Sequence, residues 1–272
     1  MSASFGTGFH ATPTGTVDAS AYERFTGRWS RLFIPAVLAD IAPGSRVLDV
    51  STGTGEAASM ALPIVGMSGF VVGADISPQM LRVATDRLHT ALFWPVAADG
   101  QALPFRDASF DSIVCQLGLQ FFPDPARGLR EFRRVLRGNG NLVICVISTP
   151  DRAPMWGILA DVISRYVPDA LRRTLYLSFS LADPARLESL LAGAGFRDIR
   201  VAREEREDIT ESFDEYWEPI EAGIGSIPQS YLALSEADRR AVRSEVKARL
   251  SQFESNGKLL MSLETLIARA RA

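Results

Sequence analysis

Two closely spaced glycines after an apolar stretch are the first feature of this chain that indicates a ligand. In "VLDVSTGTGEAA", residues 47–58, Gly53, Gly55 and Ala58 satisfy the pattern G-x-G-x-x-G/A. Asp75 ends the next apolar stretch, about 20 residues further on. Such a turn lets the backbone approach a nucleotide-like ligand, and a carboxylate can accept hydrogen bonds from two ribose hydroxyls. A nicotinamide dinucleotide and S-adenosylmethionine both meet these requirements, so the turn leaves both cofactors open.

Asp49, inside the first apolar stretch, distinguishes between the two possible cofactors. It stands just ahead of the glycine turn, where its side chain would face the ligand. A carboxylate there would repel a diphosphate, whereas the methionine end of S-adenosylmethionine carries an ammonium group. The alternative is that Asp49 only satisfies buried amides at the end of a strand, because buried carboxylates need such partners. Asp49 therefore favours S-adenosylmethionine.

Strand and helix patterns alternate along the chain. Strands are predicted at 46–50, 69–75, 92–98, 110–117, 141–147, 196–205 and 258–270. Helices are predicted at 20–41 in one or two pieces, at 54–65 with a break near Pro63, and at 79–88, 126–136, 155–167 and 185–195. Three of these helices should begin at the pairs Ser77-Pro78, Asp124-Pro125 and Asp183-Pro184. Because consecutive parallel strands need a crossover helix, this order predicts a doubly wound α/β, Rossmann-like sheet of about seven strands. We expect it to be mostly parallel with an antiparallel last strand, and to carry a helical cap.

The organisation predicted for the whole chain is one domain behind a short leader. Residues 1–19 are expected to form a flexible leader, and 20–272 a single domain. Lid helices are expected at 20–42, with cap insertions at about 151–182 and 204–256. The second insertion is too apolar in places to be a linker.

Composition excludes several classes of partner. The chain has 272 residues, 47% of them hydrophobic, and a formal net charge of −3, so it lacks the basic surface that a nucleic acid needs. No apolar stretch reaches the roughly 18 residues that span a bilayer, so a cytoplasmic location is the default expectation. Cys115 and Cys145 lie in apolar stretches and are expected in the core. His10 and His89 are too few for a metal cluster, so no metal is expected.

Five motifs in order resemble those of a known family. They are "VLDVSTGTG", "VVGADISPQML", "AADGQALPF", "SFDSIVCQLGLQFFPDP" and "REFRRVLRGNGNLVI". Together they resemble class I S-adenosylmethionine-dependent methyltransferases, in particular the small-molecule branch that includes the ubiquinone and menaquinone methyltransferases. The resemblance is strong over about residues 20–147 and loose beyond.

The resemblance implies a role for each matching residue. The backbone of the glycine turn would contact the cofactor, Asp49 would lie near its methionine group, and Asp75 would bind the ribose. Residues after the second and third strands would hold the adenine, and those after the fourth would face the sulfonium. Two residues of the leading helix would close the site as a lid. The implied cofactor residues are Tyr22, Phe25, Asp49, Ser51, Thr52, Gly53, Gly55, Asp75, Ile76, Met80, Asp99, Gly100, Gln101, Gln116 and Leu117.

Two positions depart from the family pattern. Ser51 and Thr52 stand where Gly and Cys are commonest, and a serine cannot take a positive φ at low cost. "RGNG", residues 137–140, replaces the usual Pro-Gly-Gly turn before the fifth strand, and Asn139-Gly140 should still make a tight turn. Neither change is expected to prevent cofactor binding.

The reaction that follows is methyl transfer to an oxygen, nitrogen or carbon nucleophile of a small, largely apolar or aromatic molecule, leaving S-adenosylhomocysteine. No convincing base is visible, so the catalytic residues are left unknown and positioning is expected to supply much of the rate. Asp151, Tyr176, Glu215 and Tyr216 are candidates for a base or a substrate contact, each with a plain structural alternative. Ligands of open α/β sheets bind beyond the carboxyl ends of the strands, where aromatic residues would line the substrate pocket unless they form the core of the cap. The proposed lining includes Phe213 and Ile224, and the tentative substrate residues are Trp156, Tyr176, Phe179, Tyr216 and Trp217.

Three other functions remain as alternatives. The fold could carry a reaction without methylation, such as a cyclisation, because fold does not fix function. The glycine pattern alone would also suit a nicotinamide-dependent oxidoreductase. A nucleic-acid or protein methyltransferase is disfavoured. The cations of "DRRAVRSEVKARL", residues 238–250, alternate with acids, so we expect them to form a solvent-exposed helix face. A monomer or a homodimer is expected.

Overall fold

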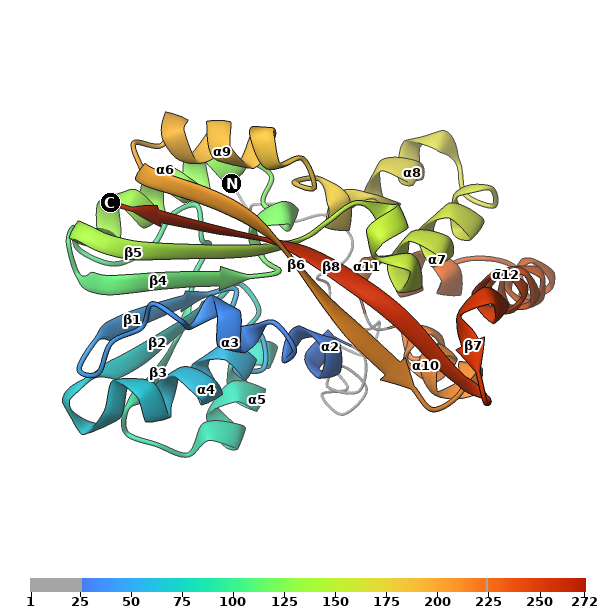
Figure 1. The fold of residues 1–272 in the computed structure, drawn as a ribbon, viewed down its shortest axis with the longest axis horizontal. Helices are drawn as coiled ribbons and strands as arrows, with labels where there is room; N and C mark the ends of the chain where they lie inside the picture. Colours follow the sequence, from blue (N-terminus) through green and yellow to red (C-terminus); the bar gives the residue numbers. More distant parts are fainter. Residues whose placement is uncertain (1–25, 224) are drawn as a thin grey trace.

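The structure is a computed structural model that describes residues 26–223 and 225–272, with the backbone alone at Ser226. The predicted leader, the lid residues Tyr22 and Phe25, and Ile224 lie outside the described residues. Figure 1 shows a twisted sheet flanked by helices, with a group of helices beyond one end of the sheet.

Seven strands form the main path of the sheet, and a short eighth strand pairs with the beginning of the last strand. Their order is β3 (Phe93–Ala97), β2 (Phe70–Asp75), β1 (Arg46–Val50), β4 (Phe110–Gln116), β5 (Leu136–Ile147), β8 (Lys258–Arg271) and β6 (Arg197–Thr210), with β7 (Glu254–Ser255) beside β8. The first five strands are parallel, and β8 runs antiparallel to both β5 and β6. The predicted fold class, including the antiparallel last strand, is confirmed.

Helices cover both faces of the sheet because the central strands are apolar on both sides. Neighbouring residues of one strand enter opposite cores: Val47 packs with the core that contains α4 (Glu56–Val65), and Leu48 with the core that contains α6 (Pro125–Val135). The first core also takes α3 (Ile34–Val37) and α5 (Pro78–Leu88), and the second takes α9 (Pro184–Gly193).

The three helix starts predicted at X-Pro pairs are present. Ser77, Asp124 and Asp183 each accept a hydrogen bond from a backbone amide in the first turn of α5, α6 and α9. The predicted break near Pro63 is wrong: α4 contains Pro63 and continues to Val65, where a 3-10 turn follows. The described part of the lid segment forms two short helical turns, α2 (Arg28–Ser30) and α3. Pro35 at the start of α3 separates them.

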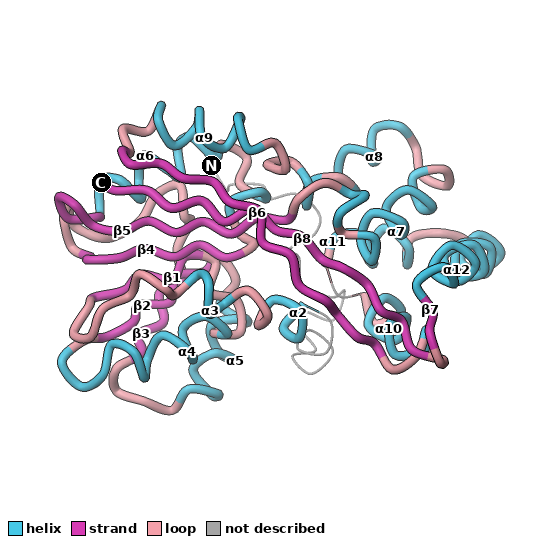
Figure 2. Tube along the Cα trace, viewed as in Figure 1, coloured by secondary structure: helices cyan, strands magenta, loops and turns pink. Residues whose placement is uncertain are grey.

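Strands β6 and β8 continue past the rest of the sheet as a two-stranded arm. The pairing of β5 with β8 ends at Ile147, opposite Thr265, whereas β6 and β8 stay paired as far as Thr210 and Leu259 (Figure 2). Residues 204–210 are therefore strand, and the prediction that helical insertion begins at 204 is wrong. In this part of β6, Glu205 and Glu207 are exposed and Asp208 is buried, while Leu259, Met261 and Leu263 of β8 are buried.

The cap helices pack around this arm. They are α7 (Pro154–Ser164), α8 (Asp169–Leu175), α10 (Phe213–Glu221), α11 (Ser226–Leu232) and α12 (Glu236–Leu250). Short 3-10 turns lie at Gly66–Ser68, Leu119–Phe121, Pro150–Arg152, Leu177–Phe179 and Ser251–Phe253. Within the described ranges, no helix combines the length and apolar character needed to cross a membrane.

Candidate functional site

The glycine turn after β1 contains three residues in the left-handed region. Ser51 has φ 60°, Gly53 φ 55° and Gly55 φ 81°. The positive φ that the sequence argued against at Ser51 is therefore present, and the turn holds a conformation that costs a non-glycine residue about 1–2 kcal/mol. A hydrogen bond from the Thr52 amide to the Ala74 carbonyl (3.1 Å) fixes the turn to β2.

Gly55 begins α4 and lets it approach α5. A Cβ on Gly55 would lie 3.1 Å from the Cβ of Ala84 and 3.2 Å from a methyl carbon of Leu88. Its side-chain direction therefore faces α5, so both its φ and this packing favour glycine.

Asp75 joins the glycine turn to the start of α5. Its Oδ2 accepts from the Gly53 amide at 2.9 Å, and its Oδ1 accepts from the Ser77 amide at 2.8 Å. Burial raises the pKa of Asp75, while these two amides oppose the shift. Each oxygen still has acceptor capacity, which suits a ligand that offers two hydroxyl groups.

Asp49 lies buried under the same turn. Its Oδ2 accepts from the Thr52 hydroxyl at 2.7 Å, and its side chain is 1% exposed. Burial, reinforced by the negative charge of Asp75, raises the pKa of Asp49 to about 7. A ligand cation beside it would compensate that burial. The neighbouring Asp49 and Asp75 thus give the site a carboxylate for a cation and another for hydroxyl groups.

Residues after β2 and β3 form the second half of the site. Ile76, which the sequence motifs implied for the adenine, is an exposed apolar side chain directly after Asp75. Asp99 accepts from the Gln101 amide at 2.8 Å, and the Gln101 side chain accepts from the Asp124 amide at 2.8 Å. A Cβ on Gly100 would lie 2.4 Å from Phe122, so only glycine fits there. Met80, also implied by the sequence, is half-buried in the first turn of α5.

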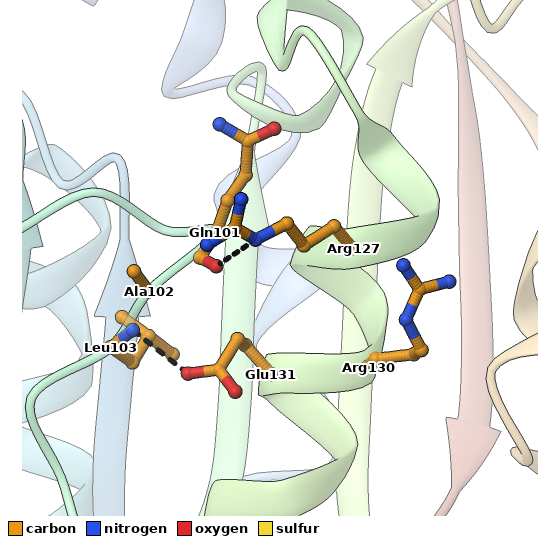
Figure 3. Close-up of a pocket in the computed structure, with 6 residues that line it drawn as sticks. All are labelled: Gln101, Ala102, Leu103, Arg127, Arg130 and Glu131. Atoms are coloured by element: carbon orange, nitrogen blue, oxygen red, sulfur yellow. Dashed lines mark hydrogen bonds between the residues drawn. The ribbon is translucent and has the colours of Figure 1, made fainter. Parts of the chain in front are cut away.

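A groove of about 360 Å³ lies between this loop and α6 (Figure 3). Arg127 Nε donates to the Gln101 carbonyl, and the Leu103 amide donates to Glu131, both at 2.9 Å. These bonds fix the loop that carries Asp99 and Gly100. Ala102 and Arg130 complete the lining.

The end of β4 connects the sheet to the lid segment. Gln116 Nε2 donates to the Ser30 carbonyl at 2.7 Å, and the Leu117 amide donates to the Cys145 carbonyl at 2.7 Å. Leu117 also has a positive φ, of 57°. The turns after β1 and β4 are therefore both strained, as is common at ligand sites.

The tentative substrate residues all belong to one apolar cluster, in which Tyr176 is partly buried and the other four are buried. Trp156 packs edge-on against Trp29 of α2, with ring centroids 5.9 Å apart. Tyr176 and Phe179 lie next to each other, with centroids 6.3 Å apart. These three side chains come from the first insertion, and Trp156 lies beside the lid segment.

Tyr216 and Trp217 make further contacts in the interior of the cap. The Tyr216 hydroxyl donates to the Met155 carbonyl at 2.6 Å, and burial raises the pKa of Tyr216. Trp217 is 1% exposed, stacks on Phe213 and donates from Nε1 to Glu221. Their contacts match the alternative reading of these aromatics as the core of the cap.

The two candidate acids have other roles in the structure. The Asp151 side chain is 78% exposed and lies 3.9 Å from Arg152. Glu215 accepts from Arg28 at 3.0 Å and belongs to an ion-pair network. Neither has the buried position expected of a base in a closed site.

Sequence reasoning missed two ionic connections of the lid segment. Arg28 donates to Asp208 at 2.9 Å and to Thr210 at 2.7 Å, both on the arm. Glu56, at the start of α4, pairs with Arg87 of α5 and with Arg31 of the lid segment. No spacing rule links residues so far apart in sequence, so only the folded chain reveals these pairs. Among the described residues, no cluster of His, Cys, Asp or Glu has the composition of a metal site.

Comparison with known proteins places this geometry in a family. Residues 48–144 match the family model described as "Methyltransferase domain". A demethylmenaquinone methyltransferase from Streptomyces griseus subsp. griseus is 34% identical over 182 residues, covering 63% of this chain and 76% of that protein. The chain belongs to the class I S-adenosylmethionine-dependent methyltransferases.

Solved structures share the fold of this methyltransferase. A Bacillus halodurans C-125 protein crystallised as a candidate methyltransferase superposes with a TM-score of 0.60 at 20% identity, covering 88% of this chain and 97% of that one. Phosphoethanolamine N-methyltransferase 2 of Haemonchus contortus, solved with S-adenosylmethionine, gives a TM-score of 0.58 at 20% identity, covering 96% of this chain and 58% of that one.

The cofactor of this methyltransferase is S-adenosylmethionine, which resolves the ambiguity of the glycine turn. The donor set agrees with that cofactor: a buried carboxylate for an ammonium, a second carboxylate with free acceptor capacity for ribose, and an exposed apolar side chain for adenine. The enzyme transfers a methyl group to a small molecule, as the sequence motifs predicted.

Proposed function

We propose that this methyltransferase acts on a quinone-type acceptor in its reduced, hydroxylated form. The observation that carries the proposal is the 34% identity to a demethylmenaquinone methyltransferase, which extends over most of that relative. The aromatic side chains of Trp29, Trp156, Tyr176 and Phe179 support it, because a flat apolar ring packs well among such residues.

In this proposal the cofactor lies across the carboxyl ends of β1, β2 and β4. Asp49 binds the ammonium, Asp75 the ribose hydroxyls, and Ile76 with Met80 the adenine face. Asp99 accepts from the adenine amine, while Gly100 and Gln101 shape the loop around the adenine edge. The backbone of the glycine turn contacts the cofactor at Ser51, Thr52, Gly53 and Gly55. Gln116 and Leu117 border the methyl group. Tyr22 and Phe25 are proposed lid residues.

Bound S-adenosylmethionine supplies an electrophilic methyl group on a sulfonium. The protein contributes alignment and a water-poor site, which can account for much of a methyl-transfer rate. Gln116 holds the lid segment against the end of β4, and the aromatic side chains exclude water from the acceptor. A hydroquinone ring is already electron-rich, so this role needs no strong base in the protein.

The test is an anaerobic assay with purified protein, S-adenosylmethionine labelled in its methyl group and naphthohydroquinone. We expect label in the extracted aromatic product and an equal amount of S-adenosylhomocysteine. A reaction without naphthohydroquinone controls for spontaneous breakdown of the cofactor. Binding of S-adenosylmethionine without any transfer to naphthohydroquinone would contradict the proposed acceptor class.

A further inference from the structure

Gln120 is a buried amide whose hydrogen-bonding groups are unused. It lies in the 3-10 turn Leu119–Phe121, four residues beyond Gln116, and is 2% exposed. Neither its Nε2 nor its Oε1 has a hydrogen-bond partner in the part of the chain that the structure describes. Buried polar side chains are almost always paired, so this amide needs an explanation.

The position of Gln120 is fixed although its side chain is unpaired. The Ser180 hydroxyl donates to the Gln120 carbonyl at 2.6 Å and joins this turn to the one that contains Phe179. The backbone at Gln120 is thus held between the end of β4 and the insertion that supplies Tyr176 and Phe179.

A second unpaired polar group lies on the lid side of the same strand end. The indole N–H of Trp29 is buried and has no acceptor among residues 26–223 and 225–272. Trp29 is adjacent in the chain to Ser30, whose carbonyl accepts from Gln116. Unused hydrogen-bonding groups therefore occur in the turn after β4 and in the lid segment, the two segments that the Gln116 contact joins.

We propose that the Gln120 side chain binds the methyl acceptor, accepting from a ring hydroxyl through Oε1 and donating from Nε2 to an oxygen of the same molecule. This inference rests on the proposed function, and it adds the polar group that recognises the acceptor. A primary amide is suited to this role because it offers a donor and an acceptor side by side. It selects a hydroxylated ring over one whose oxygens are all alkylated, because the alkylated ring leaves Oε1 unpaired.

The test compares naphthohydroquinone with its dimethyl ether, by calorimetry on the full chain saturated with S-adenosylhomocysteine. Wild-type protein should bind the hydroquinone about tenfold more tightly than the ether, and Gln120→Leu should remove that preference. The same substitution at the exposed Gln252 is the matched control and should leave the preference intact. An unchanged preference in Gln120→Leu would overturn the inference.

Two further measurements separate acceptor binding from other roles. Gln120→Leu should keep the affinity for S-adenosylmethionine and should not lower the melting temperature, since it removes an unpaired buried group. A lower melting temperature would make the amide structural, and weaker cofactor binding would assign it to the cofactor, so either result overturns the inference. If wild-type protein binds neither probe, the proposed acceptor class fails, while the melting temperature still decides on Gln120.

A carboxyl group at this position provides a positive test. Protonated Glu has one O–H donor and one carbonyl acceptor, so Gln120→Glu should bind naphthohydroquinone best at low pH and lose binding as the carboxyl ionises. A pH-independent affinity for this variant would count against a direct contact.

Discussion

The side chain of Ser51 occupies the space that a side chain at position 118 would need. A Cβ on Gly118 would lie 2.5 Å from both the Cβ and the Oγ of Ser51. The strained turn after β1 and the turn after β4 are therefore packed directly against each other. We expect Gly118→Ala to destabilise the protein and to weaken S-adenosylmethionine binding, because the turn after β1 must shift. Ser51→Gly should rescue Gly118→Ala in denaturant unfolding, and equal destabilisation in the single and double variants would contradict this contact.

Ser51→Gly alone tests the strain at the turn. Glycine relieves the positive φ but makes the unfolded chain more flexible, so we expect a net gain in unfolding free energy of only about 0.5–1 kcal/mol. Ser59→Gly, in the interior of α4, is the matched control and should lower stability. A loss of stability in Ser51→Gly as large as that of the control would show that the turn is not strained.

Cofactor binding should depend on pH through Asp49. The ligand-free pKa of about 7 means that this carboxyl is largely protonated at pH 6, whereas an ammonium ligand favours the ionised form. Affinity for S-adenosylmethionine should therefore rise between about pH 5.5 and 7.5, by at most about tenfold per unit, and binding should release a proton. Calorimetry in buffers of different ionisation enthalpy measures how many protons are released on binding. Asp49→Asn should bind weakly at every pH, and a flat profile in wild-type protein would contradict the assignment.

Removal of the Asp75 carboxylate should affect both ligand and turn. Asp75→Ala should weaken S-adenosylmethionine binding by about 1.5–3 kcal/mol, the range for hydrogen bonds to a charged group. It should also lower the melting temperature, because the amides of Gly53 and Ser77 lose their acceptor. Asp86→Ala, at an exposed position on α5, is the control. Unchanged cofactor affinity in Asp75→Ala would mean that the ribose lies elsewhere.

The hydroxyl of Tyr216 should matter for stability and not for catalysis. Tyr216→Phe removes the buried hydrogen bond to the Met155 carbonyl, so we expect a loss of about 0.5–1.5 kcal/mol in unfolding free energy. The KM for naphthohydroquinone should stay the same. A raised KM with unchanged stability would return Tyr216 to the substrate site.

The contact of the lid segment with the arm should be cooperative. Arg28→Gln leaves the buried Asp208 without its cation, so we expect destabilisation of about 1–3 kcal/mol. The double variant Arg28→Gln with Asp208→Asn should recover part of that loss, as a double-mutant cycle would measure. Strictly additive effects would show that the pair contributes nothing.

The sequence predicted the half of the molecule in which chemistry is local. Asp49, the glycine turn and Asp75 lie within one strand, turn, helix and strand, so their spacing indicated a nucleotide-like ligand, and the charge of Asp49 favoured S-adenosylmethionine. The starts of α5, α6 and α9 could also be predicted from the sequence, because a capping side chain and a proline act within one turn.

The arm and the cap depend on contacts between distant residues, and their details could not be predicted from the sequence. The alternating charges of 203–208 do not distinguish a helix from a strand, and only pairing with β8 makes this stretch part of β6. The aromatic residues of the cap carried the same ambiguity, since Trp217 in a core and Trp156 beside a lid look alike in sequence. Gln120 gave no signal, because an unpaired amide is recognised only when its surroundings are known.

The arm formed by β6 and β8 has a consequence for how such enzymes diversify. The cap is attached to one margin of the sheet, whereas the proposed methyl-donor residues come from β1, β2, β4 and the loop after β3, towards the other margin. Lengthening the arm or exchanging the helices that pack around it would reshape the space for the acceptor without disturbing the strands that retain the donor. The architecture thus lets new specificities arise in one region while the chemistry common to all of them is inherited unchanged in the other.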